Sequence, residues 1–241
     1  MQKSKILNII LAVVILVLLI MNKDSKTPAE SIKALFKESQ PVEPGKTNHT
    51  KRSLGERNLV FPEPAMVIGS YDKAGTPNIM TAAWFGVANS RPFKVSVSLR
   101  PATYSYHNIM ESKAFTVNVP DASLVPYVKF AGTYSGRDMN KFEETGLTPV
   151  KAEYVNAPYV KEFPIVLECK LTEYHDLGSH RQFIGQVVDA KIDERLLNEE
   201  GRVNMDLFDP IVYAQGKYYS GLDLIQNIQE IEPGKMNGNQ P

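Results

Sequence analysis

Short apolar runs separated by turn residues follow one another from Leu59 to Tyr219. They recur at intervals of about ten residues, and such spacing indicates an antiparallel sandwich or barrel. Alternating strand and helix units are absent, and so are the G-x-G-x-x-G and G-x-x-x-x-G-K-[ST] motifs of nucleotide-binding α/β folds. We therefore expect a mainly β fold, an antiparallel barrel with a few inserted helices.

The turn residues divide this region into separate expected elements. Asp72–Gly75 has the composition of a hairpin turn, and Gly178 separates the two longest apolar segments. The expected strands are Ala65–Tyr71, Asn78–Phe85, Lys94–Leu99, Ala114–Val119, Ile165–Tyr174, Gln182–Ile192, Val212–Ala214 and Lys217–Tyr219. Helical spacing or capping predicts helices over Thr103–Ser112, Asp121–Phe130 and Arg137–Thr145, the last ended by Gly146 in the left-handed conformation.

A different kind of segment precedes the barrel. Ile6–Met21 is apolar except for Asn8 and follows Lys3 and Lys5. Sixteen helical residues span about 24 Å, which suits a signal-peptide core or a short membrane anchor. Because no A-x-A-like cleavage site and no lipobox cysteine follow, we expect a retained signal-anchor with the body outside the cytoplasm, in the periplasm or at the cell surface.

Charge divides the chain at the same place. Residues 1–57 carry ten Lys and Arg against five Asp and Glu, whereas residues 58–241 carry seventeen against twenty-two. An acidic body argues against nucleic acid as a partner. The expected organisation is therefore an anchor or signal peptide over 1–21, a linker over 22–57, a barrel domain over 58–222 and a tail over 223–241.

Few residues offer catalytic chemistry of their own. The one cysteine, Cys169, excludes a disulfide framework and a cysteine-clustered metal site, and its apolar neighbours indicate a buried packing residue. His175 and His180 are close enough to share a metal, but with no third ligand nearby they are also explained as polar residues flanking a hairpin. Neither G-x-S-x-G nor H-E-x-x-H occurs, so a hydrolase has little support.

Three polar segments can bind a ligand or be ordinary structure. Asn78–Trp84 sets small residues beside the one tryptophan, which suits a planar ring as well as a plain strand. Ser98–Ser105 joins a strand to a helix start with Arg100 nearby, and it suits a phosphate as well as a simple N-cap. Ser135–Phe142 offers Arg137 and Lys141, either as anion ligands or as a solvated face. Taken together, a ring platform and two phosphate-type sites indicate flavin mononucleotide (FMN).

The segment from Ser53 to Tyr219 resembles the flavoredoxin branch of the flavin reductase-like, FMN-binding split-barrel family. The resemblance covers about 165 of the 241 residues. Its most specific pieces are Pro77–Trp84 and Ser135–Phe142. The other matching motifs are Pro64–Asp72, Val97–Arg100, Thr103–Ile109, Phe115–Pro120, Ala157–Tyr159, Leu167–Lys170 and Gln182–Val187.

The resemblance implies a homodimer of split β-barrels that binds FMN noncovalently near the subunit interface. By the matching motifs, the isoalloxazine would be lined by Asn78, Thr81, Ala82, Ala83 and Trp84. The ring and ribityl chain would be flanked by Ser98, Leu99 and Arg100. The phosphate would be reached by Tyr104, Ser105 and Lys141. The resemblance assigns no role to His180 or Cys169.

The function implied is that of an oxidoreductase or electron-transfer flavoprotein, with NAD(P)H or a redox protein as the other reactant. Flavin carries this chemistry itself, which agrees with the absence of a general acid or a nucleophile. A non-catalytic split-barrel protein that binds FMN or another planar ligand is the alternative. Familiar members of this branch lack a hydrophobic leader, so the electron donor does not follow from the resemblance.

Overall fold

The structure, a computed structural model, describes Gly45 and residues 50–220. The expected anchor, Ile6–Met21, most of the linker and the tail lie outside these residues. Within the described part of the chain, no helix is long and apolar enough to cross a membrane. The described residues from Glu56 to Ser220 belong to one compact unit.

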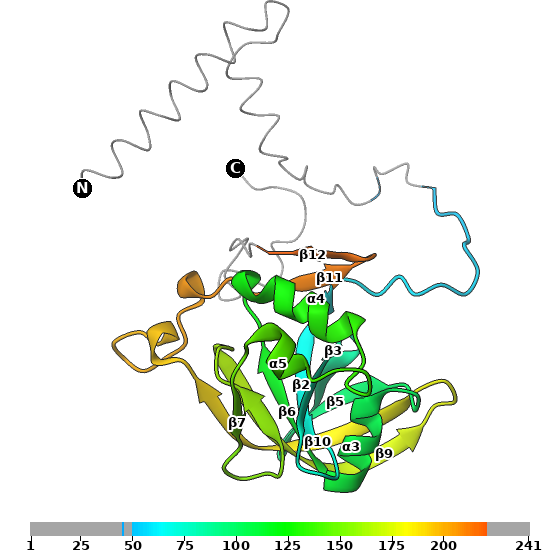
Figure 1. Cartoon of the computed structure of the whole chain (residues 1–241). Helices are drawn as coiled ribbons and strands as arrows, with labels where there is room; N and C mark the ends of the chain where they lie inside the picture. Colours follow the sequence, from blue (N-terminus) through cyan, green and yellow to red (C-terminus); the bar gives the residue numbers. More distant parts are fainter. Residues whose placement is uncertain (1–44, 46–49, 221–241) are drawn as a thin grey trace, which may run out of the picture. The chain divides into compact units, whose positions relative to one another are not determined.

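The unit is built on a seven-stranded antiparallel sheet (Figure 1). The strand order is β3-β2-β6-β9-β10-β5-β4. The bounds are β2 Met66–Tyr71, β3 Pro77–Ala82, β4 Phe85–Ser90, β5 Phe93–Leu99, β6 Ala114–Val119, β9 Ile165–Asp176 and β10 Arg181–Ile192. Smaller sheets combine β1 (Glu63–Pro64) with the hairpin of β11 (Val212–Ala214) and β12 (Lys217–Tyr219), and β7 (Pro149–Lys151) with β8 (Pro158–Val160). The expected mainly β fold with inserted helices is confirmed.

The predicted strand Asn78–Phe85 is wrong at its end, because the chain turns at Ala83 and Trp84. Phe85 N–H donates to the Ala83 carbonyl at 3.0 Å, and Ser98 N–H donates to the Trp84 carbonyl at 2.9 Å. Strand β3 therefore stops at Ala82, and β4 begins at Phe85 on the opposite edge of the sheet. Since β3 also contacts β5, the sheet curls so that its two edges approach one another.

Three α-helices are inserted between strands: α3 (Tyr104–Ser112), α4 (Val125–Thr133) and α5 (Lys141–Thr145). The predicted helix Arg137–Thr145 begins four residues late, because the Asn140 side chain caps it by accepting from Phe142 N–H. Gly146 ends it in the left-handed conformation, as expected. Asp121 caps a short 3-10 turn (Ala122–Leu124) before α4, and Pro126 lies in the first turn of α4, where its missing N–H costs nothing.

The two faces of strand β2 bury side chains in two different cores. Val67 packs with α4 and α5, whereas its neighbour Ile68 packs inside the barrel. The barrel core also holds Phe115, Phe183 and Cys169, each fully buried. Strands β2 and β3 separate the barrel core, to which α3 contributes Tyr106 and Ile109, from the layer of α4 and α5. On β3, Thr81 faces α4, whereas Asn78 faces Ser105 of α3.

Candidate functional site

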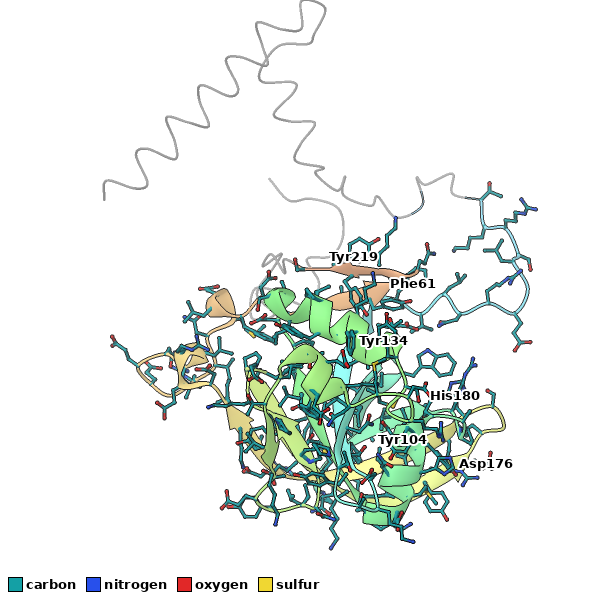
Figure 2. The ribbon with its side chains drawn as sticks, viewed as in Figure 1. Phe61, Tyr104, Tyr134, Asp176, His180 and Tyr219 are labelled. Carbon is teal, nitrogen blue, oxygen red and sulfur yellow. The ribbon has the colours of Figure 1, made fainter. Side chains whose placement is uncertain are left out.

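A cavity of about 240 Å³ lies where the start of β3 meets the start of α3 and the segment between α4 and α5. Four of the predicted site residues line it: Asn78, Tyr104, Ser105 and Lys141. They come from three elements far apart in the sequence. Tyr134, which follows α4, lines the same cavity, and Figure 2 shows it on the same face of the molecule as Tyr104.

Lys141 is the buried cation of this cavity, with 3% of its surface exposed. Its Nζ donates to the carbonyl oxygens of Ile79 at 2.8 Å and Ala131 at 2.7 Å. An ammonium group has three N–H bonds, so one donor remains for a ligand. Burial lowers the pKa of Lys141 to about 8 because it penalises the charged form. An anion in the cavity would offset that cost.

Asn78 carries an unsatisfied acceptor. Its Nδ2 donates to Ser105 Oγ at 2.8 Å, but its buried Oδ1 has no hydrogen-bond partner among the described residues. Gly136 passes so close that an added Cβ would lie 2.1 Å from this oxygen. A buried amide oxygen without a donor is unusual in a folded protein and indicates a missing hydrogen-bond donor. A ligand hydroxyl is one such donor.

A second cavity of about 270 Å³ continues from the first and shares Asn78, Tyr104, Gly136 and Arg137 with it. The Tyr104 hydroxyl donates to Asp72 Oδ2 at 2.9 Å, and the Arg137 guanidinium lies 5.6 Å from the Tyr104 ring centre. Burial and the neighbouring Asp72 carboxylate both raise the pKa of Tyr104. Tyr104 is therefore held as a neutral, oriented phenol.

The first turn of α3 borders the first of these cavities. Thr103 occupies the N-cap position, but its hydroxyl donates to the Arg100 carbonyl at 2.9 Å and caps no helix N–H. The first-turn N–H groups of a helix attract phosphate when no side chain satisfies them. The first cavity therefore combines a buried ammonium, helix N–H groups and the Ser105 hydroxyl.

Thr81 and Ala83 line a third cavity of about 700 Å³, which shares Gly132 and Thr133 with the first. The Thr81 hydroxyl donates to the Val128 carbonyl at 2.5 Å and so fixes β3 against α4. Small side chains at Ala83 and Gly132 leave the backbone open to a flat ligand. The second and third cavities are therefore neighbours of the first, with which each shares lining residues, and the three are called the groove below.

The other predicted residues lie around this groove in different ways. Trp84 is 48% exposed and lines a separate cavity with Ala83 and Phe85. Ala82 and Leu99 are buried in the barrel core, so their side chains do not line the groove. Ser98 holds the Trp84 backbone through the hydrogen bond described above, and Arg100 is exposed. The roles assigned to these residues stay predictions.

His180 packs against Trp84, although the family resemblance assigns it no role. Its ring centre lies 4.3 Å from that of Trp84, and Figure 2 shows it near the tip of the β9–β10 hairpin. Burial, and then the Arg100 charge, lower the pKa of His180, so the imidazole is neutral at pH 7. The other histidine of this hairpin, His175, has its Nε2 at 3.8 Å from Glu173 Oε2. Asp72 and Gly136 also line these cavities and belong to motifs of the family resemblance, but neither was expected to have a role in binding.

Comparison with known proteins shows the family to which the chain is similar. The family model described as "Flavin reductase like domain" matches residues 57–222. The solved flavoredoxin of Desulfovibrio vulgaris (Miyazaki F) is 42% identical with a TM-score of 0.71, over 75% of this chain and 98% of that one. An uncharacterized protein of Aquifex aeolicus is 31% identical over 67% of this chain and 85% of its own length. A ferric-chelate reductase (NAD(P)H) of Archaeoglobus fulgidus is 29% identical over 43% of this chain and 60% of its own length.

Proposed function

The chain belongs to the flavin reductase-like family, and we propose that it is an oxidoreductase that transfers electrons through FMN bound in the groove. The observation that carries this proposal is the pair of groups left incompletely bonded in one cavity. Lys141 keeps a free donor, and Oδ1 of Asn78, which lines the same cavity, has no hydrogen-bond partner among the described residues. A phosphate and a ribityl hydroxyl are the complementary groups, and FMN carries both.

Different residues of the groove would bind the phosphate, the ribityl chain and the ring of FMN. Lys141, Ser105 and the first turn of α3 would hold the phosphate, with Arg137 adding charge from the neighbouring cavity. Asn78 Oδ1 would accept from the ribityl chain, so its place lies nearer the phosphate than the predicted ring contact. Thr81 and Ala83 would lie against the isoalloxazine.

Bound FMN supplies the hydride and electron transfer, so the chain's residues need only bind, orient and shield it. Thr81 keeps the wall of the groove rigid through its bond to α4. Neutral His180 and Trp84 form an aromatic pair at the turn between β3 and β4, and this pair carries no charge.

The absorbance spectrum of the purified full-length protein tests this proposal. The two bands of oxidised flavin in the near ultraviolet and the blue should be present or should return when FMN is added. A colourless protein that does not bind FMN would contradict the proposal. The double variant Ser105→Ala/Lys141→Met should bind FMN at least about tenfold more weakly, since it removes a charged hydrogen bond to the phosphate. Lys161→Met, an exposed lysine, is the control.

We further propose NAD(P)H or a redox protein as the second reactant. Anaerobic bleaching of the flavin by NADH or NADPH indicates a reductase. Bleaching by dithionite alone indicates a carrier reduced by another protein. A non-catalytic binding protein would also be bleached by dithionite, and it is distinguished from a carrier because it exchanges no electrons with a redox protein.

We also propose that the protein is a homodimer that packs through the side of the sheet formed by β10, β5 and β4. Val87 and Phe93 are 70% and 42% exposed on neighbouring strands at this edge. Light scattering after size-exclusion chromatography should give twice the chain mass. The variant Val87→Lys/Phe93→Lys should give the monomer mass. If its mass is still that of a dimer, the interface does not include this edge of the sheet.

For residues 1–21 we propose the membrane anchor that their sequence predicts, with the barrel outside the cytoplasm. Cell fractionation should recover the full chain with membranes, and removal of residues 1–21 should shift it to the soluble fraction. Recovery of both forms in the soluble fraction would contradict the anchor.

A further inference from the structure

The widest cavity of the groove lies between α4 and the β11–β12 hairpin. Its volume is about 700 Å³, in the upper half of the range of about 300–1,000 Å³ found for small-molecule sites. In Figure 1 the hairpin lies beside α4 at one end of the barrel. Thr81 and Ala83 on its floor belong to the predicted flavin-ring residues, so a molecule in this cavity would lie next to the ring.

The charged residues of this cavity have one sign. Lys129 comes from α4 and Lys217 from β12, and no carboxylate lines the cavity in the described part of the chain. Neither lysine forms an ion pair there with a residue between 50 and 220. Two cations that pair with no carboxylate among residues 50–220 make a positive site in a body whose net charge is negative.

Two tyrosines provide the aromatic wall. The ring centres of Tyr213 and Tyr218 are 5.5 Å apart, and both residues line the cavity. Both rings are half-buried, and no hydrogen bond of either hydroxyl is recorded within the described residues. Burial raises the pKa of Tyr218, so its hydroxyl remains a donor at neutral pH.

From this arrangement we infer that the cavity between α4 and the β11–β12 hairpin binds a small planar carboxylate, an aromatic acid, next to the proposed flavin site. Lys129 and Lys217 attract the carboxylate, and the tyrosine hydroxyls donate to it. The tyrosine rings pack against the planar part. The inference rests on the proposed function, because it places this acid beside bound FMN, but the site consists of residues other than those expected to hold the phosphate.

Binding of two matched probes, 4-nitrobenzoate and the uncharged 4-nitrobenzamide, tests the inference. Each is titrated into the full-length protein by calorimetry, with and without FMN. We expect the carboxylate to bind about tenfold or more tightly than the amide, since charged hydrogen bonds contribute that much. Equal affinities for the two probes would overturn the inference.

The variant Lys129→Gln/Lys217→Gln should abolish this preference and leave FMN affinity unchanged. The control Lys151→Gln/Lys161→Gln removes the same charge from exposed lysines that line none of these cavities, and it should keep the preference. Tyr218→Phe should weaken 4-nitrobenzoate binding severalfold and leave 4-nitrobenzamide binding unchanged.

Two further outcomes would overturn the inference. The first is a preference that survives in Lys129→Gln/Lys217→Gln. The second is a tenfold loss of FMN affinity in that variant, which would assign both lysines to the cofactor. The proposed function has a different test, because it is contradicted if the unsubstituted protein does not bind FMN. The probe titration without FMN still measures binding to the cavity in that case.

Discussion

The ammonium group of Lys141 lies between two main-chain carbonyls and is buried without a carboxylate partner, so its charge depends on pH near neutrality. In the free protein it loses its proton as the pH rises through about 8. A bound phosphate favours the charged form, so binding in alkaline solution takes up a proton. We expect FMN affinity to be level below about pH 8 and to fall above it, by up to about tenfold per pH unit toward pH 10.

Quenching of flavin fluorescence at a series of pH values measures this affinity. Lys141→Met should bind more weakly at neutral pH and show a flatter profile above about pH 8, because the titrating group is gone. Parallel profiles for the two proteins would mean that Lys141 does not face the phosphate.

Gly136 lies against Asn78 and Tyr104, and its lack of a side chain allows this approach. An added Cβ would lie 2.1 Å from Asn78 Oδ1 and 2.7 Å from Tyr104 Cδ1. Gly136→Ala should therefore displace both residues and cost about 1–3 kcal/mol, seen as lower FMN affinity or a lower urea midpoint. Gly86→Ala is the matched control, since nothing lies within 4 Å of its added Cβ. Equal behaviour of the two variants would contradict the close packing described here.

At the scale of elements, Glu168 on β9 connects three parts of the barrel. It is fully buried, accepts N–H bonds from Glu153 at 3.1 Å and Tyr154 at 2.7 Å, and lies 2.8 Å from Lys191 on β10. Burial raises the pKa of Glu168, but the bonds from Lys191 and the two backbone groups outweigh it, and the pKa is lowered. Loss of Lys191 would leave a buried carboxylate without its cation.

Lys191→Met should reduce the free energy of unfolding by about 3 kcal/mol at neutral pH, as for other broken buried pairs. Because the folded pKa of Glu168 lies below its unfolded value near 4.5, the pair stabilises above that pH and is lost as pH falls through the folded pKa. Urea unfolding should show the difference from the unsubstituted protein shrinking in acid. A variant as stable as the control Lys161→Met would show that the pair contributes nothing.

Most elements followed from local sequence. The strands Ala114–Val119, Val212–Ala214 and Lys217–Tyr219 have the expected bounds, since β-branched and aromatic runs end there at turn residues or proline. Strand β4 was missed because Phe85–Ser90 is mostly exposed at a sheet edge and has no apolar alternation. The corner before it depends on a hydrogen bond from distant Ser98, which no local pattern reveals.

The site was predictable in its residue types more than in its geometry. Asn78, Tyr104, Ser105 and Lys141 do line one cavity. That Lys141 is buried could not be foreseen, because the carbonyls that hold it belong to a strand and a helix elsewhere in the chain. The contact of His180 with Trp84 depends in the same way on the packing of a hairpin tip against a strand corner.

For the whole molecule, cofactor binding should stabilise the fold by mass action. At a hundredfold excess over Kd the gain is about 2.7 kcal/mol, which corresponds to roughly 5–10 °C in Tm for a chain of this size. Riboflavin, which lacks the phosphate, should give a smaller shift at the same concentration. Differential scanning calorimetry with each compound measures this, and equal shifts would show that the phosphate adds no affinity.

The burial of Cys169 has a practical consequence for measuring these events. It is the one cysteine of the chain, its side chain is fully enclosed, and burial raises the pKa of its thiol. Thiol reagents react through the thiolate and need access, so the folded protein should be inert to maleimide. A cysteine placed on the β11–β12 hairpin outside the cavity, for example by Tyr219→Cys, would carry a fluorophore at one exposed position and would report ligand entry into the groove without a background label.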